Sequence, residues 1–260
     1  MTPTSLLFDG KQVVDPNALE SVKDKSQYKA QGEIHEEERD VSKVIKNQRI
    51  RIAFLGLEHQ TEVDKDEPFR VIGYDGASYR AQLLSDSKER YPVVTLVLYF
   101  GMTRWNKATS LFEALEISDE WKPFVNDYKI NLFEIAFLEP EQVDKFQSDF
   151  RIIADYLVQK RMNNDYVPSR EEMKHMDEVL KLMSVVAEDE RFEDVQKELH
   201  KEGGAKTMCE VLDKLVKEGK IEGKIEAYFD DGRSVEEIAQ KISISVEEVE
   251  AVIDSLNLRK

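Results

Sequence analysis

The 260-residue chain has a single cysteine, Cys209, so it can form neither an intrachain disulfide nor a zinc site built from cysteines. It contains no apolar run close to the ~20 residues that a membrane-spanning helix needs. Its amino terminus lacks the basic segment and the long apolar segment of a secretory signal. We therefore expect a cytoplasmic protein with no membrane partner.

Basic residues are scarce relative to acidic ones, 37 against 53, which gives a net charge of −16. Nucleic-acid-binding proteins usually present a basic face, so this balance argues against strong non-specific DNA binding. It does not exclude a local basic groove, because the electrostatic field depends on where the charges lie as well as on their sum.

Three apolar runs, rich in β-branched and aromatic residues, predict the strands of a sheet: residues 50–60, 93–100 and 130–138. A shorter run, from Val41 to Ile45, precedes the first of them, and the turn residues between the two predict a hairpin.

A helix is expected between the first two long strands, from Pro68 to Leu84, because proline is favoured in the first turn of a helix. Apolar residues at helical spacing predict the face that packs on the sheet: Phe69, Ile72, Tyr79 and Leu83. Strand, helix and strand in this order predict an α/β domain over residues 1–139.

Residues 140–229 are predicted to be helical, because apolar residues recur at helical spacing from Glu141 to Arg161 and again after Ser169. Ser169 and Glu172 have the spacing of a capping box, which predicts the start of a helix there. The methionine-rich stripe that follows is interpreted as core rather than as a binding surface.

In the tail, residues 230–260, Ser234 and Ser245 each stand three residues before a glutamate, which predicts two short capped helices in a helix-turn-helix-like pattern. The second helix is acidic, and phosphate would repel it from the DNA major groove. We therefore interpret the tail as a packing or oligomerisation module.

Asp40, Glu58 and Gln60 are the candidate catalytic residues, with Asp40 and Glu58 as metal ligands. Mg²⁺ prefers oxygen ligands, and nucleases use it to polarise a phosphate and to activate water. Asp40 precedes the short strand, and Glu58 and Gln60 project from one face of the next strand because strand side chains alternate. From spacing alone, Glu58 is also explained as the point where that strand leaves the core.

Three segments carry a resemblance to a known family: residues 38–41 (ERDV), 55–62 (LGLEHQTE) and 68–75 (PFRVIGYD). They resemble the recombination-promoting nuclease and putative transposase family of bacteria. The resemblance implies a PD-(D/E)xK fold, a restriction-endonuclease-like mixed sheet flanked by helices, with Mg²⁺-dependent DNA endonuclease activity. In it, Asp40 and Glu58 match the metal-binding carboxylates, and Gln60 matches a position where many superfamily members carry lysine.

The resemblance also implies contacts with the substrate. Arg70 is the nearest candidate for a phosphate contact, because a guanidinium group binds phosphate through paired hydrogen bonds. Tyr74 is a second candidate for contact with the DNA backbone, with packing as its alternative role.

One segment departs from the family pattern. Members usually begin with a helix carrying an acidic residue ahead of a Phe-Asp-Gly-Lys segment, whereas here residues 8–11 (FDGK) stand almost at the amino terminus. We expect that helix, and a third acidic ligand, to be missing. Two functions remain open: a Mg²⁺-dependent DNA endonuclease that acts on DNA through a local site, or a catalytically silent interaction or oligomerisation protein derived from the family, with homo-oligomers as its expected form.

Overall fold

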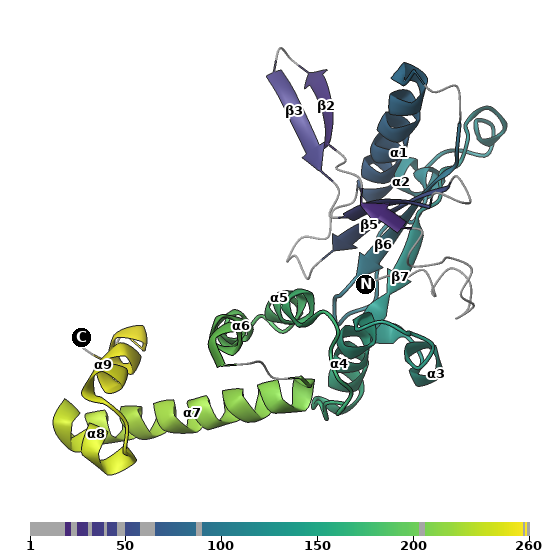
Figure 1. Ribbon diagram of the computed structural model, residues 1–260. Coiled ribbons are helices and arrows are strands. Elements are labelled where there is room, and N and C mark those ends of the chain that lie inside the picture. Colours follow the sequence, from purple (N-terminus) through teal and green to yellow (C-terminus); the bar gives the residue numbers. More distant parts are fainter. Residues whose placement is uncertain are drawn as a thin grey trace. The chain divides into compact units, whose positions relative to one another are not determined.

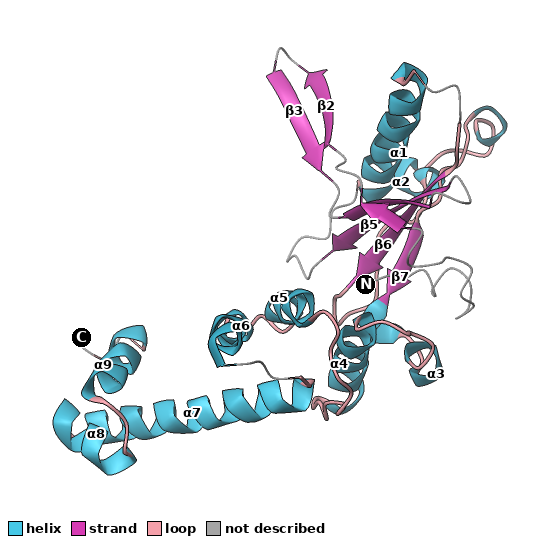
Figure 2. Cartoon of the chain, in the orientation of Figure 1, coloured by secondary structure: helices cyan, strands magenta, loops and turns pink. Residues whose placement is uncertain are grey.

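The computed structural model describes residues 19–21, 25–30, 33–38, 41–45, 50–57, 66–86, 90–202, 206–256 and 258. The chain divides into two compact units, Met1–Val167 and Pro168–Lys260. The first unit contains strands and helices, whereas the elements described in the second unit are all helices (Figure 2). None of the described helices is long and apolar enough to cross a membrane.

A five-stranded sheet forms the centre of the first unit (Figure 1). Its order is β1 (Leu19–Ser21), β4 (Val41–Ile45), β5 (Ile50–Leu57), β6 (Val93–Tyr99) and β7 (Asn131–Glu134). The pairs β1–β4 and β4–β5 are antiparallel, whereas β5, β6 and β7 are parallel. The mixed α/β character and the hairpin expected from the sequence are therefore confirmed. A separate antiparallel ribbon consists of β2 (Lys25–Ala30) and β3 (Glu33–Glu38).

Strand β6 is buried on both faces. Its residues from Thr95 to Tyr99 all lie in the interior, and Leu96 and Val97 have no exposed surface. A strand covered on both sides reads as a continuous apolar run, which is why the sequence identified it.

Strand β7 is shorter than the predicted strand over residues 130–138, because Ile135–Phe137 forms a 3₁₀ turn, η4. Ile135 and Ala136 remain fully buried in this turn. The apolar run therefore correctly indicated burial, but the burial continues after the strand has ended.

Helix α1 (Glu67–Leu84) forms where it was predicted, with proline in its first turn. The predicted inward face is wrong: Phe69, Tyr79 and Leu83 are exposed. The buried face instead combines apolar and polar side chains: Glu67, Pro68, Val71, Tyr74, Asp75, Ser78 and Gln82. Hydrophobic periodicity missed this face because several of its buried residues are polar.

Between β6 and β7 lie α2 (Leu111–Leu115) and η3 (Lys122–Phe124). After η4, the helix predicted from Glu141 to Arg161 is two helices, α3 (Pro140–Val143) and α4 (Phe150–Asn163). The chain turns between them, and Phe146 packs edge-on against Phe150 with 5.2 Å between ring centroids.

The second unit contains five described helices: α5 (Met176–Val186), α6 (Arg191–Glu202), α7 (Met208–Asp230), α8 (Val235–Ile242) and α9 (Val246–Ser255). The helix start predicted at Ser169 is wrong, because the chain there is extended and the Met173 amide donates to the Lys206 carbonyl. In α5, Val179, Leu180 and Met183 are fully buried, which confirms the core interpretation of that stripe.

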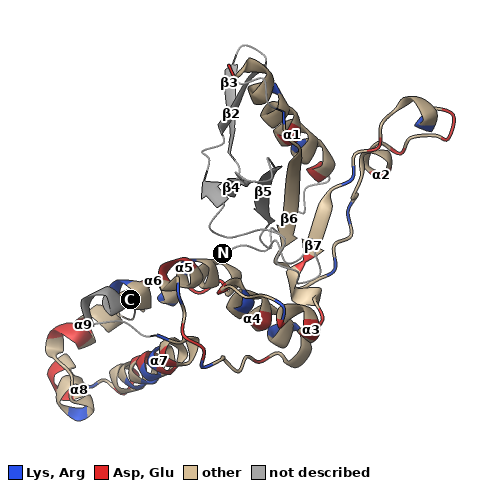
Figure 3. Cartoon of the chain, turned by 45° about the vertical axis from the view of Figure 1, so that its right-hand side comes forward, with Lys and Arg blue, Asp and Glu red and all other residues tan. Residues whose placement is uncertain are grey.

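The two capping boxes predicted in the tail are present, since Ser234 caps α8 and Ser245 caps α9. The two helices pack on the end of α7 through a core that contains Ile225, Ile238 and Val249. Figure 3 marks the acidic residues of both helices in red.

Candidate functional site

The three predicted catalytic residues, Asp40, Glu58 and Gln60, lie outside the described residues. The strand ends that they flank in the sequence are described. Strand β4 begins at Val41, which pairs with Phe54 of β5, and β5 ends at Leu57. Because β4 and β5 are antiparallel, the start of β4 and the end of β5 belong to the same edge of the sheet.

That edge also holds the carboxyl ends of the parallel strands. Leu57 of β5 pairs with Tyr99 of β6, and Tyr99 pairs with Glu134 of β7. Each of these three residues is the last of its strand. Segments that leave the ends of parallel strands form the usual ligand sites of open α/β sheets, so this edge is the candidate functional site.

Helix α1 runs antiparallel to β6 and brings its first turn toward this edge. Gln82, in its last turn, exchanges two hydrogen bonds with the backbone of Tyr91, at 2.9 and 3.1 Å. Asp75, near its middle, is bonded to Thr95, four residues further along the chain than Tyr91. Residues earlier in α1 are thus bonded to residues later in the segment that contains β6. The first turn of α1, which contains Arg70, therefore lies toward the carboxyl end of β6.

Arg70 and Tyr74 occupy neighbouring turns of α1 but different environments. The Arg70 side chain is 39% exposed, and its Nη1 lies 3.4 Å from Oε2 of the buried Glu67. Tyr74 is 5% exposed and belongs to a core cluster with Val71 and Val97. Arg70 is therefore accessible to a substrate, whereas the ring of Tyr74 packs in the core; contact of either with DNA stays a prediction.

The carboxylate of Asp75 anchors α1 to the sheet. Asp75 is 3% exposed. Its Oδ1 accepts a hydrogen bond from Thr95 Oγ1 at 2.5 Å, and its Oδ2 accepts one from the Tyr128 hydroxyl. These two hydrogen bonds join α1 to β6 and to the segment that leads into β7. They therefore fix the rotation of the helix that carries Arg70.

The loop after β6 folds back over the end of its own strand. Gly101 lies against the Tyr99 ring so closely that a Cβ atom there would meet ring atoms at 2.2 Å. Trp105 packs edge-on against the same ring, with 5.3 Å between centroids. Any other residue at position 101 would have to displace the buried Tyr99 ring.

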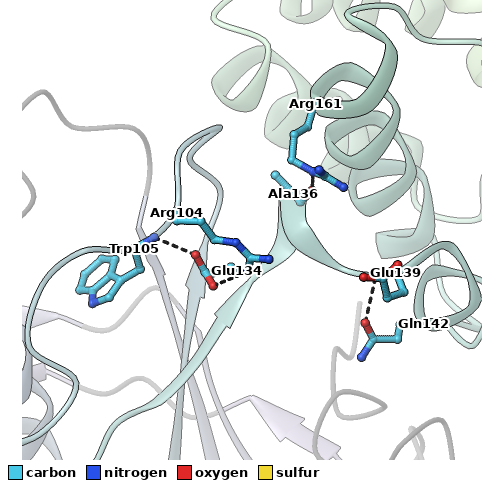
Figure 4. A network of polar contacts seen from close by, with 7 residues as sticks. All are labelled: Arg104, Trp105, Glu134, Ala136, Glu139, Gln142 and Arg161. Atoms are coloured by element: carbon cyan, nitrogen blue, oxygen red, sulfur yellow. Dashed lines mark hydrogen bonds and ion pairs between the residues drawn. The ribbon is translucent and has the colours of Figure 1, made fainter.

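Glu134 holds this loop beside the end of β7 (Figure 4). Its Oε1 accepts a hydrogen bond from the Trp105 amide at 2.7 Å, and its Oε2 lies 2.8 Å from Arg104 Nη1. The Arg104 side chain is nonetheless 65% exposed. The guanidinium group is therefore positioned at the sheet edge with most of its surface in solvent.

A second arginine reaches the same place from α4. Arg161 Nε donates to the Ala136 carbonyl at 2.6 Å. Its guanidinium carbon lies 5.0 Å from the centroid of the Phe137 ring, and that of Arg104 lies 4.2 Å from the same centroid. In Figure 4 the two side chains come from different elements and converge on the turn after β7.

Reasoning from the sequence missed Arg104, Glu134 and Arg161. The sequence contained a signal for the first two, since Arg104 follows one predicted buried strand and Glu134 lies in another. Polar residues near the carboxyl ends of such strands often belong to ligand sites. Nothing in the sequence linked Arg161 to them, because its neighbours come together only through the turn of η4.

Within the described part of the chain, no three histidine, cysteine, aspartate or glutamate side chains lie close enough to hold one ion. Asp40 and Glu58 are outside that part, so their assignment as metal ligands stays a prediction from the sequence.

Comparison with known proteins identifies one family. The profile of the family described as "Putative transposase, YhgA-like" matches residues 12–194, which is more than two thirds of the chain. The match contains all five of the predicted site residues and the whole of the edge described above. Neither a curated protein nor a solved structure matches the chain.

Proposed function

Because this chain belongs to the family of YhgA-like putative transposases, we propose that it is a Mg²⁺-dependent DNA endonuclease with a restriction-endonuclease-like PD-(D/E)xK fold. The reaction is hydrolysis of a DNA phosphodiester bond. The family match supports a role on DNA, and the residues at the sheet edge support the chemistry.

The observation that carries the proposal is the antiparallel pairing of β4 with β5. It joins the start of β4 and the end of β5 at one edge of the sheet, and Asp40 and Glu58 flank those two ends in the sequence. Two carboxylates from adjacent strand ends are a donor set that suits Mg²⁺, which takes one or two protein carboxylates and completes its shell with water and phosphate oxygens.

The roles of the chain's own groups follow from their chemistry. When bound, Mg²⁺ supplies a Lewis acid for the phosphate and lowers the pKa of a bound water. The Gln60 amide has both a donor and an acceptor and carries no charge, so its role is to orient water or phosphate. Arg70 supplies positive charge from the first turns of α1, where its side chain is partly exposed.

A plasmid-nicking assay tests the proposal. Supercoiled DNA is incubated with the wild type and with Asp40→Asn and Glu58→Gln, each with Mg²⁺ and with excess chelator. We expect the wild type to nick the plasmid and the chelator to abolish nicking. Each substitution should lower the nicking rate by more than ~100-fold, because loss of a residue that only supports a metal ligand costs up to ~100-fold.

Charge-matched substitutions provide the control. Asp119→Asn and Glu120→Gln remove the same charge from exposed positions in the segment between β6 and β7, and should leave the rate unchanged. Equal nicking by the wild type and both site variants would remove the catalytic assignment. No nicking by the wild type would instead favour the silent interaction protein.

A further inference from the structure

Arg104 and Arg161 form a cationic pair on the turn after β7. Both guanidinium carbons lie no more than 5.0 Å from the centroid of the Phe137 ring. Guanidinium groups stack on aromatic faces and keep their N–H edges available while stacked. The pair therefore presents a fixed set of donors rather than two mobile side chains.

The charge of this pair is only partly neutralised. Glu134 faces Arg104 at 2.8 Å, but its other oxygen accepts the Trp105 amide. Arg161 uses Nε for the Ala136 carbonyl, and none of the described carboxylates lies within 4.0 Å of its guanidinium group. Arg161 is exposed, and its positive charge is therefore not neutralised by a carboxylate of the described residues.

A purely structural role explains part of this arrangement. Arg104 helps to hold the loop after β6, and Arg161 lies in the last turn of α4, where the helix dipole favours a cation. Neither role accounts for the convergence of both groups on one ring.

The position of the pair relates it to the proposed nuclease site. Leu57, Tyr99 and Glu134 form one row across β5, β6 and β7. Neighbouring strands are ~4.8 Å apart, so the end of β7 lies ~10 Å from the end of β5. That distance corresponds to about three nucleotides along one DNA strand, at ~3.4 Å each.

We propose that Arg104 and Arg161 bind the phosphate backbone of duplex DNA a few nucleotides from the bond to be cleaved. The identity of the ligand rests on the proposed function, whereas the existence of a paired-arginine anion site rests on the geometry alone. Phe137 orients both groups, and Glu134 positions Arg104 without neutralising the pair.

DNA binding measured separately from cleavage tests this inference. The Asp40→Asn protein, with Mg²⁺ present, is titrated into a fluorescein-labelled duplex of ~20 base pairs, and anisotropy is followed from about 50 to 200 mM salt. We expect the double variant Arg104→Gln/Arg161→Gln to bind the duplex about tenfold more weakly, or weaker still. The slope of the logarithm of the binding constant against the logarithm of the salt concentration should become shallower by about 1.8, since each phosphate contact contributes ~0.9.

Two further variants keep the test decisive. Arg151→Gln is the matched control, because Arg151 lies on the same helix α4, about 15 Å from Arg161 at 1.5 Å per residue, and it should leave the slope unchanged. The Arg104→Lys and Arg161→Lys double variant preserves charge and should retain the salt slope while binding more weakly, because lysine offers no planar group to stack or fork. A thermal melt of each variant confirms that it is folded.

The outcomes separate the two proposals. Wild-type affinity and slope in the folded double glutamine variant would overturn the arginine site, even if the wild type nicks plasmid. Binding that depends on both arginines, in a protein that nicks nothing, would support the arginine site and reject the nuclease.

Discussion

Asp75 shows how single residues of α1 prepare the site. A carboxylate buried to this degree is stable only when its oxygens are hydrogen-bonded. Both are, through Thr95 of β6 and the hydroxyl of Tyr128, which lies in the segment that leads into β7. The bonds fix the rotation of the helix that carries Arg70 near the carboxyl end of β6.

Replacing Asp75 with asparagine should destabilise the first unit. The amide would place a donor where the carboxylate accepts two hydrogen bonds, so one buried hydroxyl would lose its acceptor. We expect the free energy of unfolding to fall by about 1–3 kcal/mol, measured by urea denaturation. Ser78→Ala is the control: Ser78 is buried on the same face but bonds only to its own helix, at the Tyr74 carbonyl, and should cost less than ~1 kcal/mol. Equal losses in the two variants would show that Asp75 is no anchor.

Individual site residues were predictable from the sequence only where a local motif carried them. Arg70 was identified by its resemblance to a family motif, and the structure finds it on an accessible part of α1. Arg161 carried no motif, since its relation to Arg104 depends on how η4 turns the chain. Contacts between residues far apart in sequence are set by tertiary packing, which periodicity does not encode.

At the scale of elements, the predicted strands and helices were mostly correct, and the errors share a cause. Strand β6 and helix α1 have nearly their predicted bounds. The predicted strand at 130–138 and the helix at 141–161 were too long, because buried residues continue through η4 and through the turn before α4. A run of apolar residues predicts that those residues are buried. It does not predict where a strand or helix ends when the buried chain changes direction.

The start of α6 offers a prediction at this scale. Asp189 accepts hydrogen bonds from the Arg191 guanidinium at 2.7 to 3.2 Å and from the Arg191 amide at 3.1 Å. The bond to the Arg191 side chain is the main reason that the pKa of the Asp189 carboxyl lies below its usual value, with the amide bond adding to it.

A lowered pKa in the folded state means that this carboxylate stabilises the fold above its unfolded pKa, near 3.9, and that the stabilisation is lost as the pH falls through the folded-state pKa. Asp189→Asn should therefore lower the free energy of unfolding by about 0.5 kcal/mol at pH 7, a value suited to a partly exposed pair. The difference should disappear in acid. Chemical unfolding followed by circular dichroism at several pH values measures it, and Glu190→Gln is the charge-matched control. A loss that is the same at every pH would contradict the account.

At the scale of the whole molecule, the acidic balance does not exclude the proposed role on DNA, because the local field depends on where the charges lie as well as on their sum. The exposed acidic side chains of α9 belong to the second unit: Glu247, Glu248, Glu250 and Asp254. The arginines that we assign to DNA belong to the first. The composition alone could not reveal this, since a net charge contains no information about position.

The division into two units also required the structure. Helices α3 and α4 follow the boundary expected from the sequence at residue 139, yet they group with the first unit. Helix α4 packs against η4 and contributes Phe150, Ile153 and Leu157 to the buried interior. Sequence identified a helical region there, but which core a helix joins depends on long-range packing.

The central claim is that Asp40 and Glu58, which flank the adjoining ends of β4 and β5, hold one divalent metal. Electron paramagnetic resonance of Mn²⁺, which accepts the same oxygen ligands as Mg²⁺, measures this directly in the wild type and in Asp40→Asn and Glu58→Gln. The account predicts one bound Mn²⁺ per chain in the wild type, displaced by excess Mg²⁺, and binding weakened at least ~100-fold in each variant. Unchanged Mn²⁺ binding in the folded variants, or no binding by the wild type, would contradict it.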